Sequence, residues 1–110
     1  MTLAELKTAL EGVNDSAFKD KVAYRAFPIG AAPALPFICF YEVESNNFLA
    51  DSKVYHKITE VNIELYTDQK DQTTENAVES MLNDNQLVWD KSEYYISSEN
   101  MLQIVYGIEI

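Results

Sequence analysis

The sequence predicts an α+β fold, in which a mainly antiparallel sheet carries two helices on one face, and two observations support this prediction. Apolar residues recur at helical spacing in two segments, one at the N-terminus and one between residues 71 and 86, whereas other segments alternate or are continuously apolar, as strands are. Two helices cannot cover both faces of a doubly wound parallel sheet. The expected order is α-β-β-β-α-β-β, in a single domain spanning residues 1–110.

Both predicted helices begin at capping residues. Thr2 and Glu5 stand in the spacing of a capping box, in which each side chain bonds the backbone N–H of the other residue. Gly12 and Asn14 are suited to end this helix. Asp71 can cap the second helix because its side chain can accept from a free N–H of the first turn. The apolar stripes are Leu3, Leu6, Leu10 and Val13 in the first helix, and Ala77, Val78, Met81 and Leu82 in the second.

Five segments have the pattern of strands: residues 21–28, 37–43, 54–67, 87–97 and 101–110. The second is apolar on both faces at its start, which is typical of a strand covered on both sides there. The third alternates and is the longest, so we expect one continuous strand. The side chains expected to meet the helices are Val61, Ile63, Leu65, Leu102, Ile104, Tyr106 and Ile108.

The composition excludes several classes of protein. Hydrophobic residues make up 47% of the chain and aromatic residues 12%, which argues against a disordered chain. The net charge of -10, from 18 acidic and 8 basic residues, disfavours binding to nucleic acid or to an anionic membrane. No apolar run approaches the roughly 20 residues of a membrane-spanning helix. The amphipathic start is unlike a signal peptide, and a single cysteine allows no internal disulfide, so we expect an intracellular setting.

The sequence offers few candidates for catalysis. His56 and Cys39 are the sole histidine and cysteine, and they fall on separate predicted strands without an orienting partner. His56 is interpreted as a strand-end residue, and Cys39, between Ile38 and Phe40, as a small buried hydrophobe. We therefore expect no enzyme activity and no catalytic residue.

Metal and cofactor sites are not expected either. Carboxylates are numerous but dispersed; Glu42 with Glu44, and Glu60 with Glu64, alternate along strands, so each pair is predicted to point to one sheet face. Such pairs are more typical of a solvated sheet face than of a metal cluster. The three glycines are isolated and form no phosphate-binding loop.

A family resemblance begins at residues 45–71, "SNNFLADSKVYHKITEVNIELYTDQKD", which follow a proline-flanked strand ending in "ICFY". The later stretch "LNDN…WDKSEYYISSENMLQIVYGIEI" fits the same pattern: a tyrosine-rich strand, a polar turn and a closing strand. The chain resembles, over nearly its whole length, small tail proteins of long-tailed phages and prophages of Gram-positive hosts. These are the tail terminator, or tail completion, proteins, whose architecture is similar to that of the bacteriophage lambda tail terminator.

The resemblance implies a structural virion protein. Members of this family assemble, usually as six copies, into a ring on the head-proximal end of the tail tube. The ring stops tube polymerisation and presents a surface to the head connector. The implied partners are further copies of this chain, the major tail tube protein and head-tail connector proteins, with assembly in the bacterial host cytoplasm. DNA would pass through an acidic channel without binding, since carboxylates repel phosphate. No cofactor and no membrane are implied.

The resemblance also points to a contact surface in the polar stretch before the longest strand. Phe48 and Leu49 are two large apolar residues within otherwise polar turn chemistry. They would contact a neighbouring protomer or the tube, with asparagines supplying adaptable hydrogen bonds; alternatively, they pack back over their own sheet. The predicted interface residues are Asn46, Asn47, Phe48, Leu49, Asp51, Lys53 and Tyr55.

Three other functions remain open at this point. A head-tail joining or head completion protein would occupy an adjacent layer of the same virion. An inhibitor that mimics DNA by its acidic surface belongs to a different class, and it would need carboxylates spaced along one exposed face. A small hydrolase is disfavoured by the lone histidine and cysteine.

Overall fold

The structure is a computed structural model that describes residues 1–45, 47–50 and 53–110, apart from the side chains of residues 48–50 and 53–56. Its fold is α+β, as predicted. The elements are α1 (Leu3–Glu11), α2 (Val13–Ser16), β1 (Val22–Tyr24), β2 (Phe37–Ser45), β3 (Phe48–Ala50), β4 (Lys53–His56), β5 (Thr59–Thr67), α3 (Gln72–Asp84), β6 (Trp89–Ile96) and β7 (Met101–Glu109).

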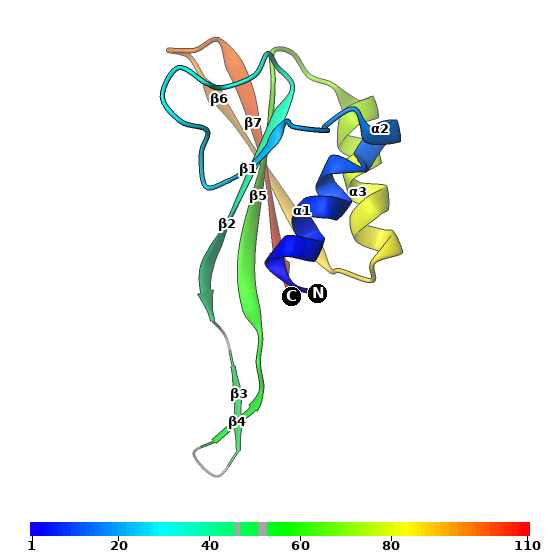
Figure 1. Cartoon of the computed structure of the whole chain (residues 1–110), viewed down its shortest axis with the longest axis vertical. Helices are drawn as coiled ribbons and strands as arrows, with labels where there is room; N and C mark the ends of the chain where they lie inside the picture. Colours follow the sequence, from blue (N-terminus) through cyan, green and yellow to red (C-terminus); the bar gives the residue numbers. More distant parts are fainter. Residues whose placement is uncertain (46, 51–52) are drawn as a thin grey trace.

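A five-stranded sheet in the order β1-β2-β5-β7-β6 forms the centre of the molecule, and β3 and β4 form a separate two-stranded sheet. The short β1 pairs with β2 in parallel, and every other pair is antiparallel. The helices lie on one face of the large sheet (Figure 1), so its other face carries no helix from the described residues. This arrangement confirms the prediction of a mainly antiparallel sheet with helices on one side.

The predicted caps fix the starts of α1 and α3. The Thr2 hydroxyl accepts from Glu5 N at 3.1 Å, and Glu5 Oε1 accepts from Thr2 N at 3.0 Å, which completes the capping box. Asp71 accepts from Thr74 N at 3.1 Å and from the Thr74 hydroxyl at 2.6 Å. Both caps satisfy N–H groups that have no partner within the helix.

α1 ends at Glu11 with Gly12 as its C-cap, as predicted, but the chain does not then lead directly into β1. Instead it makes one further turn, α2, in which Asn14 and Asp15 have φ angles of 55° and 56°. Asn and Asp tolerate this left-handed region better than most residues. The turn is followed by Phe18, which is buried in the core.

The expectation of one continuous strand over residues 54–67 is wrong. The first strand, β4, ends at His56, and β5 begins at Thr59. β4 pairs with β3, whereas β5 pairs with β2 and β7. At the break, the backbone N–H of Ile58 donates to the side chain of Asn47 at 3.1 Å rather than to a strand. The alternation of side chains continues through this region of the sequence, so periodicity alone gives no sign of the change of partner.

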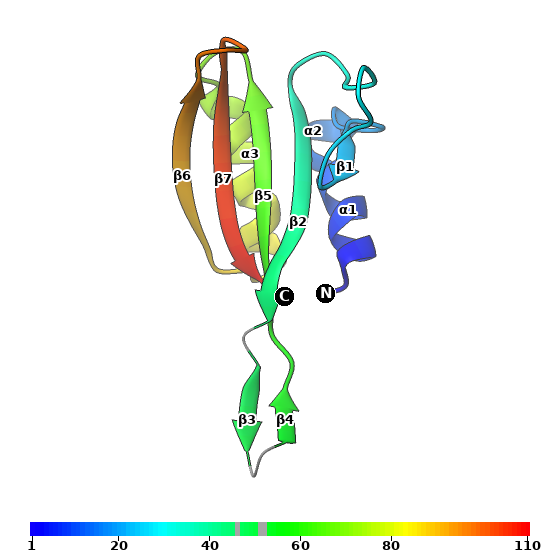
Figure 2. The same ribbon diagram turned by 90° about the vertical axis from the view of Figure 1, so that its left-hand side faces the viewer.

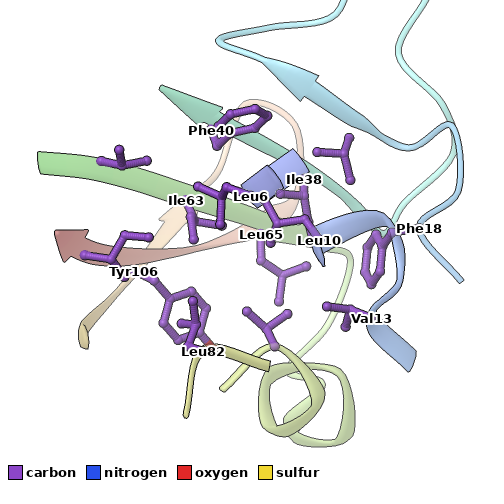
Figure 3. Packing of buried hydrophobic residues seen from close by; sticks show 14 of the residues in the cluster. Leu6, Leu10, Val13, Phe18, Ile38, Phe40, Ile63, Leu65, Leu82 and Tyr106 are labelled. Atoms are coloured by element: carbon purple, nitrogen blue, oxygen red, sulfur yellow. The ribbon is translucent and has the colours of Figure 1, made fainter. Parts of the chain in front are cut away.

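The core lies between the large sheet and the helices (Figure 3), and most of the predicted residues fill it. The buried members of the predicted set are Leu6, Leu10, Val13, Val61, Ile63, Leu65, Val78, Leu82, Ile104, Tyr106 and Ile108. Leu3 and Met81 pack against its edge. Leu102 is only partly buried, because it lies at the start of β7 opposite the exposed Tyr95 on the edge strand β6.

Candidate protein interface

The most distinctive feature is the β3–β4 hairpin, here called the ribbon. Figure 2 shows it projecting beyond the end of the large sheet, where β2 finishes and β5 begins. The molecule is 50 Å long but 28 and 23 Å across, and the ribbon lies along the long direction. A two-stranded hairpin alone is marginally stable in water, so contact with another surface would stabilise it.

The predicted interface residues fall on or beside this ribbon. Asn46 and Asp51 lie outside the described residues. Four others are placed by their backbone, with side chains outside the described part: Phe48 and Leu49 in β3, and Lys53 and Tyr55 in β4. The ribbon brings these four together in one hairpin, and their contacts with a neighbouring molecule stay a prediction.

Asn47 is the one predicted interface residue whose side chain is described. It is partly buried, and its Oδ1 accepts from the backbone N–H of Ile58. Asn47 therefore links the two segments of the chain that meet at the base of the ribbon. This bond helps to position the ribbon, and contact of Asn47 with a partner stays a prediction.

Several polar side chains on the helix-free face of the sheet are hydrogen-bonded to one another. The Tyr66 hydroxyl donates to Glu64 Oε1 at 3.0 Å, and Gln103 Nε2 donates to Glu64 Oε2 at 2.8 Å. Tyr41 accepts from Asn62 Nδ2 at 3.3 Å. These bonds hold Glu64 in a network that needs no metal. Among the described residues, no group of three His, Cys, Asp or Glu side chains could hold a metal ion.

Cys39 lies on the same face and is buried, as the sequence indicated. Burial, and then the negative charge of Glu64 on the neighbouring strand, raise the pKa of the Cys39 thiol to about 11. The thiol is therefore protonated at neutral pH, which makes it a poor nucleophile. The side chain of His56, on the ribbon, lies outside the described part of the chain.

A row of three glutamates crosses the sheet at the base of the ribbon. Glu44, Glu60 and Glu109 stand directly opposite one another on β2, β5 and β7. Like charges in such positions repel. Partial burial, followed by the charges of Glu44 and Glu109, raises the pKa of Glu60 above its usual range. No ion pair to a described residue offsets this repulsion.

Sequence reasoning missed this row because of a bulge in β2. The register shifts between Glu42 and Glu44, so that Glu42 stands opposite Val61 and Glu44 opposite Glu60. The prediction that Glu42 and Glu44 point to the same face is therefore wrong. An extra residue in one strand leaves no mark in the alternating pattern, so only the pairing shows it.

Comparisons with protein-family models, with curated proteins and with solved structures found no match for this chain. No helix in the described ranges is both long and apolar enough to cross a membrane.

Proposed function

We propose that this chain is a tail terminator, a structural protein that forms a ring at the head-proximal end of a phage tail tube. The ring, of six copies as in the family it resembles, ends tube polymerisation and joins the tail to the head. The observation that carries the proposal is the ribbon. It extends from a body that folds around its own core, in the stretch of sequence where the family resemblance begins.

The ribbon suits ring assembly because of how rings are built. In a ring, one surface of each protomer meets a different surface of the next. A projecting hairpin is one such surface, and the compact body offers the other. The two parts are separate in space, so each protomer can contact one neighbour through its ribbon and another neighbour through its body.

The charge of the chain supports passage of DNA through such a ring. Each copy carries a formal charge of -10, to which the row of Glu44, Glu60 and Glu109 contributes. Acidic groups facing a channel would repel the phosphate backbone and keep DNA from adhering. The implied partners are the major tail tube protein below the ring and the head connector above it.

The proposal is tested by silencing the gene in the phage or prophage that encodes it. We expect tubes of uncontrolled length and heads without tails in electron micrographs, and rescue when the wild-type chain is supplied. Tails of normal length that fail to join heads would instead assign the chain to the head-tail joining layer. Normal virions would reject both assignments and leave the acidic DNA mimic, which is then tested by inhibition of a nucleic-acid enzyme.

A further inference from the structure

We propose that a groove at the ribbon end of the body receives the ribbon of a second copy of this chain. The inference rests on the proposed function, because it names the contact that would join neighbouring protomers of the ring. The groove, here called the end groove, has a volume of about 600 Å³. The residues that line it include Glu60, Val88, Trp89, Asp90, Gly107 and Glu109.

The end groove is built by three segments: the start of β5, the connection from α3 into β6, and the end of β7. Gly107 stands opposite Asp90 in the pairing of β6 and β7. A Cβ atom at position 107 would lie 2.6 Å from Asp90 Oδ1, so the Asp90 carboxylate occupies the space that a side chain would fill. Because glycine has no side chain, position 107 leaves room in the groove for the Asp90 carboxylate.

The connection into β6 lines the end groove beside Trp89, whose ring itself packs against the core on the helix side of the sheet. The Trp89 ring packs edge-on against Tyr106 with 5.7 Å between ring centroids, and its Nε1 donates to Asn83 Oδ1 at 2.9 Å. Beside it, Val88 is 88% exposed and contributes nothing to its own core. Such an exposed valine at the groove is a surface onto which an apolar side chain of a partner can pack.

Another part of the end groove is acidic, and its charge is not neutralised. Glu60, Asp90 and Glu109 line the groove, and none of them forms an ion pair with a described residue. The pKa of Glu60 is raised first by its partial burial and then by repulsion from Glu44 and Glu109. A positively charged partner would relieve this repulsion.

The stretch of sequence from residue 46 to residue 57, which contains the ribbon, has the opposite charge. It contains Lys53, Lys57 and Asp51 and therefore carries a formal +1, which leaves -11 for the rest of the chain out of the total of -10. Its sequence also supplies the large apolar residues Phe48 and Leu49. The ribbon thus combines basic and apolar residues, as the groove combines acidic and apolar residues, and this complementarity selects the partner.

The ribbon of the same copy is directed away from its own groove. β2 and β5 stay paired as far as Ser45 and Thr59, and the ribbon continues from there beyond the sheet (Figure 2). The contact is therefore between copies, with the ribbon as donor and the groove as receiver. Such a head-to-tail contact can close into a ring.

Charge reversal gives a direct test. One variant carries Lys53→Glu and Lys57→Glu in the ribbon, and the other carries Asp90→Lys and Glu109→Lys in the groove. Each alone places like charges in contact, so we expect self-association at least about tenfold weaker than in the wild type. Mixed one to one, the two variants restore opposite charges at every contact, and association should return in an alternating assembly. Sedimentation velocity at low salt measures this, and thermal unfolding checks that each variant is folded.

Cross-linking locates the contact independently. In a Cys39→Ser background, one preparation carries Val88→Cys and a second carries Tyr55→Cys. Oxidation of the mixture should yield a disulfide-linked pair. The matched control replaces Val88→Cys with Ile29→Cys, since Ile29 is fully exposed in the loop between β1 and β2. We expect at least about tenfold more product with position 88 than with position 29, in line with a specific interface.

The outcomes separate this inference from the proposed function. Rings that form without the cross-link, or that tolerate either reversal, would overturn the end groove and leave the terminator proposal standing. A specific cross-link from a chain whose loss leaves virions normal would support the groove and overturn the terminator. A cross-link no stronger than the control, with no effect of the reversals, would overturn the groove.

Discussion

The body of the molecule buries its apolar side chains within itself, whereas the ribbon is a two-stranded sheet that lies beyond that core. In the body, the apolar side chains of the helices cover one face of the sheet. On the other face, the side chains of Glu64, Tyr66 and Gln103 are hydrogen-bonded to one another. The ribbon pairs only its own two strands, and its sequence lacks the acidic charge of the rest of the chain. Substitutions in the body should therefore act on unfolding, and substitutions in the ribbon on association.

The largest effect is expected from Ile63→Ala in the centre of the body. Ile63 is fully buried on β5 between Phe40 and Tyr106 on the neighbouring strands. Truncating a buried isoleucine removes contacts and leaves a cavity, so the free energy of unfolding should fall by about 2–5 kcal/mol. Urea denaturation followed by circular dichroism measures this.

The matched control is Val43→Ala on the neighbouring strand β2. Val43 is 48% exposed, so its truncation should change the free energy of unfolding by less than about 0.5 kcal/mol. An Ile63→Ala protein with the denaturation midpoint of the wild type would contradict the assigned core.

A smaller loss is expected from Asp71→Ala at the start of α3. The cap bonds to Thr74 would be lost, which typically costs about 1 kcal/mol. The same bonds lower the pKa of Asp71, so its contribution is present above the usual carboxyl pKa and is lost as the pH falls through the folded-state pKa. Unfolding curves of the variant and the wild type should therefore converge as the pH falls below the folded-state pKa of Asp71, while Asp68→Ala should match the wild type throughout.

Local chemistry made much of the body predictable from sequence. The capping pairs at Thr2 and Asp71 and the alternation through Ile63 depend on residues close in sequence, and the structure confirms them. The α+β class followed from counting helices against strands. What sequence could not show was pairing: the bulge near Glu44 and the change of partner at Ile58 depend on which strands meet.

The candidate site was predictable only in part, for the same reason. Phe48 and Leu49 stood out because two large apolar residues interrupt a polar segment. The end groove left no such mark, since its acids come from β5, β6 and β7 and gather only once the sheet forms. Gly107 carried the nearest signal, as an isolated glycine inside a strand often marks close approach of another group.

A slight gain in stability is expected from Glu60→Gln at the boundary between body and ribbon. The substitution removes one charge from the row formed with Glu44 and Glu109, so Tm should rise, by at most a few degrees. Because the folded state raises the pKa of Glu60, the wild type loses stability as the pH rises through that pKa. The gain should be present at neutral pH and disappear below about pH 4. Glu99→Gln, in an exposed turn, is the control, and an equal gain there would rule out repulsion within the row.

The smallest effect on unfolding is expected from Phe48→Ala combined with Leu49→Ala in the ribbon. Both residues lie in β3, which belongs to the separate two-stranded sheet and not to the five-stranded sheet that carries Ile63, so we expect the free energy of unfolding to change by less than about 0.5 kcal/mol. Association should be lost, because an apolar anchor within a polar rim provides most of the binding energy of such contacts.

Denaturation of the monomer, together with electron microscopy of tails from a phage carrying the double substitution, separates the two regions. Tails of uncontrolled length with normal monomer stability would fit a ribbon that acts only between molecules. A protein that unfolds much more easily would show that Phe48 and Leu49 pack back over their own sheet, the alternative that the sequence left open. Normal tails and normal stability would remove the ribbon from the assembly altogether, since neither folding nor contact would then depend on its two largest apolar residues.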